Sequence, residues 1–465
     1  MKNLIGIGRF FFFLSSVLFI SCEDYLEVEV PDQKIISKTI FDNEVTAQSA
    51  MVGLYNQLSD LSFSSGGRNS VTVLAGLSAD NLSPIYETTI PMVEFDQHEI
   101  SLDNNMNFQL WSSAYNIIYT TNSLLEGIQN SDHLSEEVKN KLEGESKFVR
   151  AFTYFYLVNL YGDVPLVTTT DYQENALTSK TSKEVIYNKI IEDLTDASLL
   201  LNEGYSSGER TQVNKLTAFA LLARVQLYLQ NWEEAINKSS EVIGSNHYQL
   251  LSNPNEVFLK NSKEAIWQFS PVGRGLSLTN TPEGGTFIID PFWYFLAEFK
   301  LNEEFVQSFN SQDERLASWI GLSEELGVYF PYKYKINNST EEATEYSMVM
   351  RLAEQYLIRA EAKAKMGDME GAIADLNMIR IRAGLKPVEE VEQNIDQDRL
   401  LSLIMQDRNK ELFTEWGHRW LDLRRTDKTE EEFSSSIGWE STDIYYPIPE
   451  SELMKNSNLT QNEGY

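Results

Sequence analysis

The sequence predicts a mainly α-helical protein, with a tetratricopeptide-like scaffold of about four helix pairs and an irregular, loop-rich portion that contains short β-strands. Three observations lead to this prediction. Apolar residues recur at helical spacing in several long segments, one pattern of alanines occurs twice, and two other segments are rich in Gly, Pro, Ser and Asn. With 42% hydrophobic and 12% aromatic residues, the 465-residue chain has ample material for a packed core.

Four segments carry an apolar stripe that fits one face of a helix. They are residues 43–58, 108–128, 135–161 and 183–201. The third is expected to end at Gly162, with Pro165 shortly after it, because glycine often follows the last helical turn and proline cannot continue one. Since each stripe covers only one face, these helices are expected to pack against one another.

Two further segments, residues 216–243 and 356–384, share a spacing of small residues. In each, two alanines lie twelve positions apart on either side of a polar turn: Ala223 with Ala235, and Ala360 with Ala372. In a tetratricopeptide hairpin, this spacing places a small side chain on each of two antiparallel helices where they approach most closely. We interpret the recurrence as a degenerate repeat, and an ordinary helical hairpin is the alternative.

The irregular portion is predicted at residues 62–107 and 244–346. Short aromatic and β-branched runs there, such as residues 265–269 and 286–289, predict strands, and the Gly, Pro, Ser and Asn between them predict loops. Long loops in a compact fold often carry function. We expect a single domain over residues 22–465, with the helical scaffold at about 43–61, 108–243 and 350–425.

One helical segment near the C-terminus alternates in charge. The alternating residues are Arg408, Glu411, Glu415, Arg419, Asp422 and Arg424. Their near-helical spacing favours ion pairs within and between helices, and a solvated charged face is the alternative. Trp416 and Trp420, four positions apart, are expected to pack from one helix face.

Charge and cysteine content exclude several classes of function. The chain has 38 Lys and Arg against 69 Asp and Glu, a formal net charge of −31. Such acidity repels phosphate, so neither nucleic acid nor a membrane contact through a basic patch is expected. One Cys cannot build a disulfide framework or a cysteine zinc site, and the four His residues lack ligand spacing. We therefore predict no metal and no cofactor.

No catalytic motif has the context that its chemistry needs. Residues 204–208 match G-x-S-x-G, but they follow the end of a predicted helix rather than a buried strand, so we interpret them as a linker. Phosphate-binding and dinucleotide-binding glycine loops are missing from the sequence. A glycosidase pair depends on the distance between two carboxylates, which the sequence does not give. The protein is predicted not to be an enzyme.

The N-terminus has the pattern of an export signal over residues 1–21. Lys2 and Arg9 precede an apolar run at residues 10–20, which is shorter than the roughly 20 residues that span a bilayer. Cys22 is the only cysteine of the chain and lies where this run ends. The junction resembles a bacterial lipoprotein signal, which implies lipidation of Cys22 and a chain that is anchored to the membrane rather than integral to it.

Aromatic residues in the irregular portion are the candidate ligand contacts, because a ring face stacks on the C–H face of a sugar. Pro291 disfavours strand pairing, so at least one neighbouring ring should project from a loop. A residue beyond Pro84 could supply a second wall if the two loops converge. The candidates are Phe292, Trp293, Tyr294 and Tyr86, followed by Trp319 and Tyr332 with more strand-like neighbours. The alternative is that most of these rings are core.

Taken together, these segments resemble the SusD/RagB family of outer-membrane lipoproteins from Bacteroidetes. The resemblance covers essentially the whole chain, and the matching segments occur in the same order as in the family. The matching segments are residues 22–26 (CEDYL), 50–56 (AMVGLYN), 110–122, 143–167, 356–384, 408–425 (RNKELFTEWGHRWLDLRR) and 446–465.

The resemblance implies an exported lipoprotein in which helix pairs support an irregular ligand-binding half. It also implies a partner, a SusC-like TonB-dependent β-barrel transporter that takes up the captured glycan, or in some members a peptide. We therefore predict a surface-exposed, lipid-anchored outer-membrane protein that binds oligosaccharides or polysaccharides and delivers them to the transporter. A peptide-binding or protein-binding lipoprotein is the alternative, with a surface glycosidase third.

Overall fold

The computed structural model describes residues 39–271, 281–436 and 438–465. The predicted export signal and Cys22 lie outside these residues. None of the helices in the described ranges is both long enough and apolar enough to cross a membrane.

The four long helices expected from the apolar stripes are present. They are α3 (Glu44–Asp60), α6 (Asn105–Gln129), α7 (Glu136–Tyr161) and α9 (Lys183–Leu200). Helix α6 begins earlier than predicted because the Asn104 side chain accepts hydrogen bonds from the backbone N–H groups of Met106 and Asn107, at 2.9 and 3.0 Å. Helix α7 ends as expected at Gly162, whose φ of 75° is readily adopted by glycine.

The alanine pattern corresponds to two helical hairpins. They are α10 (Lys215–Tyr228) with α11 (Trp232–Gly244), and α15 (Leu352–Lys365) with α16 (Met369–Arg382). Ala223 and Ala235 are fully buried in one cluster, and Ala360 and Ala372 are fully buried in another. Small side chains therefore lie where the helices approach, as the spacing predicts.

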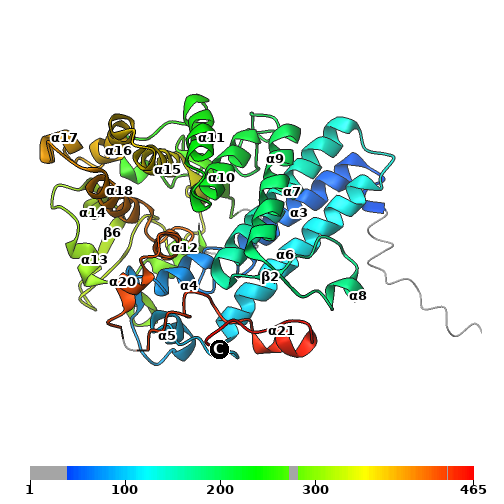
Figure 1. Cartoon of the computed structure of the whole chain (residues 1–465), viewed down its shortest axis with the longest axis horizontal. Helices are drawn as coiled ribbons and strands as arrows, with labels where there is room; N and C mark the ends of the chain where they lie inside the picture. The colour runs from blue at the N-terminus through cyan, green and yellow to red at the C-terminus, as the bar shows by residue number, and fades with distance from the viewer. Residues whose placement is uncertain (1–38, 272–280, 437) are drawn as a thin grey trace, which may run out of the picture.

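These hairpins join the long helices in one continuous stack (Figure 1). Helix α7 packs on α6 and α9, α10 on α9 and α11, and α15 on α11, α16 and α18 (Gln397–Leu412). Helix α19 (His418–Arg425) follows α18 and contacts it. The prediction of a mainly α-helical, tetratricopeptide-like fold is confirmed.

The strands of the described residues form two-stranded antiparallel pairs. They are β1 (Leu82–Pro84) with β5 (Phe299–Leu301), β2 (Val164–Pro165) with β3 (Lys180–Thr181), β4 (Ala265–Phe269) with β8 (Ser347–Arg351), and β6 (Ile320–Ser323) with β7 (Val328–Pro331). The predicted strand at 265–269 is β4. The strand predicted at 286–289 is wrong, because Thr281 caps a short helix that begins at Pro282.

Short helices fill much of the portion that was predicted to be irregular. They are α4 (Val71–Leu77), α5 (Ile90–Asp96), η2 (Pro254–Glu256), α12 (Pro282–Phe287), η3 (Tyr294–Leu296), α13 (Glu303–Gln307) and α14 (Glu314–Trp319). Others decorate the scaffold or follow it, namely α8 (Tyr172–Asn175), α17 (Val388–Val391), α20 (Thr429–Phe433) and α21 (Glu450–Lys455). Residues 204–208 form no strand-to-helix turn, in agreement with the linker interpretation.

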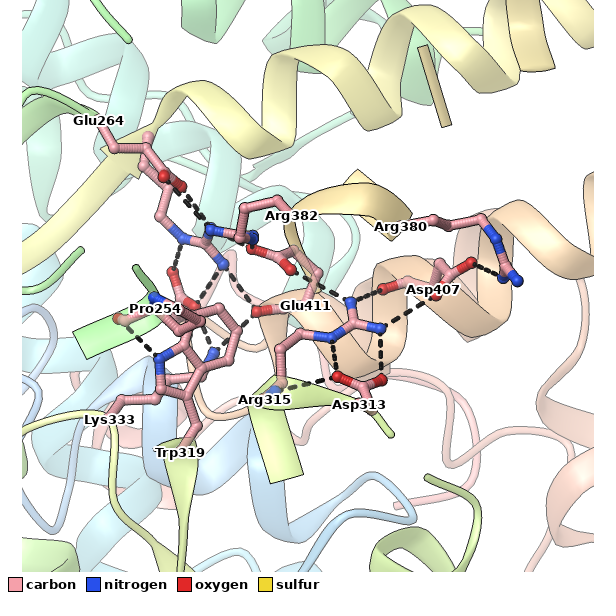
Figure 2. Close-up of polar contacts among 12 residues, drawn as sticks. Pro254, Glu264, Asp313, Arg315, Trp319, Lys333, Arg380, Arg382, Asp407 and Glu411 are labelled. Carbon is pink, nitrogen blue, oxygen red and sulfur yellow. Dashed lines mark hydrogen bonds and ion pairs between the residues drawn. The ribbon is translucent and has the colours of Figure 1, made fainter. Parts of the chain in front are cut away.

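A buried ion network joins the C-terminal helices to the strand-containing half (Figure 2). Its members are Glu264, Asp313, Arg315, Lys333, Arg351, Arg380, Arg382, Asp407, Glu411 and Glu415. Arg351 at the end of β8 reaches Glu264 at 2.9 Å and Glu415 at 2.8 Å. Arg315 of α14 reaches Glu411 of α18 at 3.2 Å. The charged segment around residue 411 is therefore paired in the interior, and the alternative of a solvated face is wrong for its buried members.

The expectation that Trp416 and Trp420 share a helix face is wrong. Gly417 lies between them with a φ of 68°, so α18 and α19 are separate helices. A Cβ atom at Gly417 would lie 2.5 Å from the Cβ of Ala75, so the close approach of α4 also requires glycine. Both tryptophans are nevertheless buried in the main core.

Candidate functional site

An exposed run of large apolar side chains lies between α12 and β5. We call residues 292–296, Phe-Trp-Tyr-Phe-Leu, the aromatic turn. Their exposed fractions run from 36% for Tyr294 to 84% for Phe292. Five consecutive exposed apolar residues are unusual for a soluble surface, where such patches commonly mark interaction sites. The aromatic turn is therefore the leading candidate site.

Local hydrogen bonds fix the shape of the aromatic turn. The Asp290 carboxylate accepts the backbone N–H groups of Phe292 at 2.8 Å and Trp293 at 3.2 Å. A single 3₁₀ turn, η3, follows at Tyr294–Leu296. Successive side chains of this compact turn point in different directions, and all five are exposed among the described residues. The rings thus stay exposed in a defined backbone.

The rings of the aromatic turn contact one another edge to face. Phe295 lies 5.8 Å from Trp293 and 6.0 Å from Tyr294 between ring centroids, with interplanar angles of 62° and 82°. Such contacts restrict the rotamers of exposed rings. They leave ring area open to solvent on all three residues.

Strand pairing brings the second predicted loop to the aromatic turn. Pro84 of β1 is the register partner of Phe299 of β5, and the Ile85 N–H donates to the Glu298 carbonyl at 2.8 Å. Because the pair is antiparallel, β1 ends where β5 begins. Tyr86, 40% exposed, therefore follows β1 at the same edge from which the aromatic turn enters β5. We call Tyr86 and the aromatic turn together the aromatic platform.

A charged pair borders the aromatic platform. The Arg68 guanidinium lies 3.0 Å from the Glu298 carboxylate, and both side chains are partly exposed. Partial burial raises the pKa of Glu298, and Arg68 opposes that shift. These groups can offer hydrogen bonds beside the rings.

A second acidic group lies nearby on α5. Burial raises the pKa of Asp96 to about 6; Lys300 of β5 opposes the shift, and Glu87 adds to it. Among the described residues named so far, three acids, Glu87, Asp96 and Glu298, lie near two cations, Arg68 and Lys300.

The remaining predicted contacts, Trp319 and Tyr332, are less exposed than the aromatic platform. Trp319 is fully buried within the ion network, its indole N–H donates to the Pro254 carbonyl at 3.0 Å, and the Lys333 ammonium lies 4.8 Å from its ring centroid (Figure 2). The prediction of Trp319 as a ligand contact is wrong, because no face of the ring reaches solvent. Tyr332 is half-buried, with the Lys335 ammonium 4.1 Å from its ring centroid.

Sequence reasoning missed four residues of this surface. Phe295 and Leu296 extend the exposed run beyond the predicted contacts Phe292, Trp293 and Tyr294, and the unbroken apolar run in the sequence could have indicated them. Arg68 and Glu298 carry no local signal, because they are far apart in the chain and meet only through the fold.

Two hollows among the described residues lie away from the aromatic platform, and none of its residues lines either one. One hollow of about 490 Å³ lies at the C-terminal segment, lined by residues that include Asp163, Lys180 and Tyr445. Another of about 610 Å³ lies beside α11, with Glu234 and Lys238 in its lining. Within residues 39–271, 281–436 and 438–465, no cluster of three or more His, Cys, Asp or Glu side chains is arranged to hold a metal ion.

Two family models match the chain. The model described as "Starch-binding associating with outer membrane" matches residues 24–227, and the model described as "SusD family" matches residues 322–443. Together they include most of the helical scaffold and the charged C-terminal segment.

Individual relatives match along nearly the full length. SusD-like protein P25 of Formosa agariphila is 26% identical, with 96% of this chain and 97% of the relative covered. A SusD superfamily protein from Bacteroides vulgatus has a similar fold, with a TM-score of 0.81, 22% identity, and coverage of 92% of this chain and 100% of that one. A laminarin-binding SusD-like protein gives a TM-score of 0.74 at 24% identity, with 91% and 100% covered. The chain belongs to the SusD/RagB family.

Proposed function

We propose that this protein is a non-catalytic glycan-binding protein and that the aromatic platform contacts the sugar. The observation that carries the proposal is the exposed aromatic turn beside Tyr86, held by the β1–β5 pair. Sugar rings present C–H faces that stack on aromatic rings, while their hydroxyls accept and donate hydrogen bonds. Arg68 and Glu298 offer both kinds of partner at the edge of the platform.

The shape of the platform favours an extended ligand. Its side chains are 36–84% exposed, so several sugar units of a longer chain have access to them at once. Such contact gives weak, reversible binding, with dissociation constants from micromolar to millimolar, or roughly −8 to −4 kcal/mol. Weak binding suits a protein that passes its ligand on.

Family membership supports the remaining parts of the proposal. One similar fold belongs to a protein described as laminarin-binding, and one matching family model is described as starch-binding and associated with the outer membrane. We infer that Cys22 is lipidated, that the protein is anchored at the outer membrane facing the exterior, and that it delivers glycans to a SusC-like TonB-dependent transporter. Cys22→Ala should release the protein from the membrane fraction; retention there would contradict lipid anchoring.

The test of ligand class is a glycan array beside a peptide panel, with affinities of each hit measured by calorimetry. Trp293→Ala should weaken glycan binding by roughly 1–3 kcal/mol, since losing a central ring typically costs that much. Tyr172→Ala is the matched control, because Tyr172 is 75% exposed on α8, at the opposite end of the molecule from α13 in Figure 1. It should leave glycan affinity unchanged.

Other outcomes would select the alternatives. Peptide binding without glycan binding would favour a peptide-binding lipoprotein. Release of reducing sugar from a bound glycan would favour a glycosidase. For the partner, mild-detergent extraction and pull-down of the native lipoprotein should recover a large transporter, and its repeated absence would contradict delivery to one.

A further inference from the structure

The charges around the aromatic platform bear on which glycans it accepts. Arg68 is a described cation beside the aromatic turn, and its guanidinium is already paired with Glu298 at 3.0 Å. A ligand carboxylate or sulfate would have to compete with Glu298 for Arg68. An anionic ligand therefore meets a neutralised cation rather than a free one.

The other ionisable groups near the platform are mainly acidic. Asp290 lies at the base of the aromatic turn and caps it through its carboxylate. Glu87 directly follows Tyr86 and is exposed. Asp96 of α5 interacts electrostatically with both Lys300 and Glu87. Together with Arg68 and Glu298, the described residues named here comprise four acids, Asp290, Glu87, Asp96 and Glu298, and two cations, Arg68 and Lys300.

The whole chain adds a repulsive field of the same sign. Its formal net charge is −31, with 69 acidic and 38 basic residues. At an ionic strength of about 0.1 M, charges further away than roughly 10 Å are largely screened, so the local acids dominate near the rings. At low salt, the distant acids also oppose the approach of an anion.

We infer that the aromatic platform selects uncharged oligosaccharides over glycans that carry uronate or sulfate groups. The inference rests on the proposed function and narrows its ligand class. Stacking supplies the attraction for both kinds of glycan, and the acidic surroundings penalise only the charged kind.

The experiment compares each neutral glycan with a charged copy of itself. Maltohexaose, laminarihexaose and cellohexaose are tested intact and after oxidation of their primary hydroxyls to carboxylates, with calorimetry at 20 mM and 500 mM NaCl. An intact sugar that binds should do so at least tenfold more tightly than its oxidised form at 20 mM NaCl. At 500 mM the ratio should fall below about threefold, because salt screens the repulsion.

A charge variant tests whether the local pair is responsible. Glu298→Gln frees Arg68, so the ratio of neutral to oxidised affinity at 20 mM NaCl should fall about fivefold. Glu174→Gln removes one charge from exposed α8 and should leave the ratio within twofold. An unchanged ratio in Glu298→Gln would overturn the local explanation.

The outcomes separate this inference from the proposed function. Tighter binding of the oxidised sugars, or of a sulfated oligosaccharide on the array, would overturn selectivity for neutral glycans while leaving glycan binding intact. Failure of every glycan on the array to bind would overturn the proposed function, and this inference with it.

Discussion

The buried ion network and the aromatic platform reverse the usual distribution of side chains. The network places five cations and five anions in the interior, and the platform places large apolar side chains in solvent. Charged groups are buried at little cost only when they are paired, and exposed aromatics add little to folding. Loss of one network partner should therefore destabilise the fold, whereas loss of a platform ring should affect ligand binding and leave the fold stable.

The pKa shifts inside the network show how well its charges are compensated. Burial alone would raise the pKa of Glu411, but the guanidiniums of Arg382, Arg351 and Arg315 hold it well below the usual range. Glu145 of α7 is a contrast: it is equally buried, its Oε2 has no hydrogen-bond partner among the described residues, and burial raises its pKa to about 7, with Lys141 opposing. The same residue type is thus stabilised as an anion in one place and as a neutral acid in the other.

The largest effect is expected from Glu411→Gln. The substitution keeps the shape but leaves five network cations against four anions, so partly unpaired guanidiniums remain buried. Breaking a buried pair typically costs about 3–5 kcal/mol, and the free energy of unfolding in guanidinium chloride should fall by that amount. Glu431→Gln, which removes the exposed Lys428–Glu431 pair, should change it by less than about 0.5 kcal/mol. A loss below about 1 kcal/mol in Glu411→Gln would mean that the network is dispensable.

A pair of tryptophans gives the second test. Trp319→Ala should lower the free energy of unfolding by about 3–4 kcal/mol, because it opens a cavity within the network and removes the partner of the Pro254 carbonyl. Trp293→Ala, which removes a 61% exposed ring, should change it by less than about 0.5 kcal/mol. If the two variants lost equal free energy of unfolding in thermal or chemical unfolding, Trp293 would be part of the folding core, and the contrast between the network and the platform would be wrong.

The sequence predicted the features that depend on local patterns and failed for those that depend on contacts between distant segments. The helices and alanine hairpins were predictable because their signals are local: apolar periodicity, caps, and Ala223 twelve positions before Ala235. Trp319 was misassigned because its burial depends on distant Pro254 and Lys333. The pairing of Arg68 with Glu298 depends on the β1–β5 register, which no local pattern specifies.

Glu145→Gln tests the unpaired buried acid. The folded-state pKa of about 7 exceeds the ordinary value of 4.5, so the neutral form favours folding, and this contribution is lost as the pH rises from 4.5 through 7. Glutamine mimics the neutral form. The variant should therefore match the wild type near pH 4.5 and be more stable at pH 8 by about 1–3 kcal/mol.

Thermal unfolding of both proteins across this pH range measures the difference. Glu174→Gln, on exposed α8, should show no such pH dependence. If Glu145→Gln were less stable than the wild type at pH 8, the ionised carboxylate would have to be compensated, as Glu411 is.

The smallest effect, and the one that defines the extent of the platform, is expected from Tyr86→Ala. Tyr86 is 40% exposed and lies at the flank of the aromatic turn, so it should contribute less stacking area than Trp293. We expect glycan affinity to fall about fivefold, or ~1 kcal/mol, with the melting temperature within about 2 °C of the wild type. Tyr172→Ala again serves as the control for an exposed tyrosine away from the platform.

Combining Tyr86→Ala with Trp293→Ala gives a double-mutant cycle, and a coupling energy above about 0.5 kcal/mol would indicate that one sugar chain contacts both loops. If Tyr86→Ala binds as tightly as the wild type, the ligand contacts only the aromatic turn. Tyr86 would then lie beside the turn because of the β1–β5 pairing, without contacting the ligand.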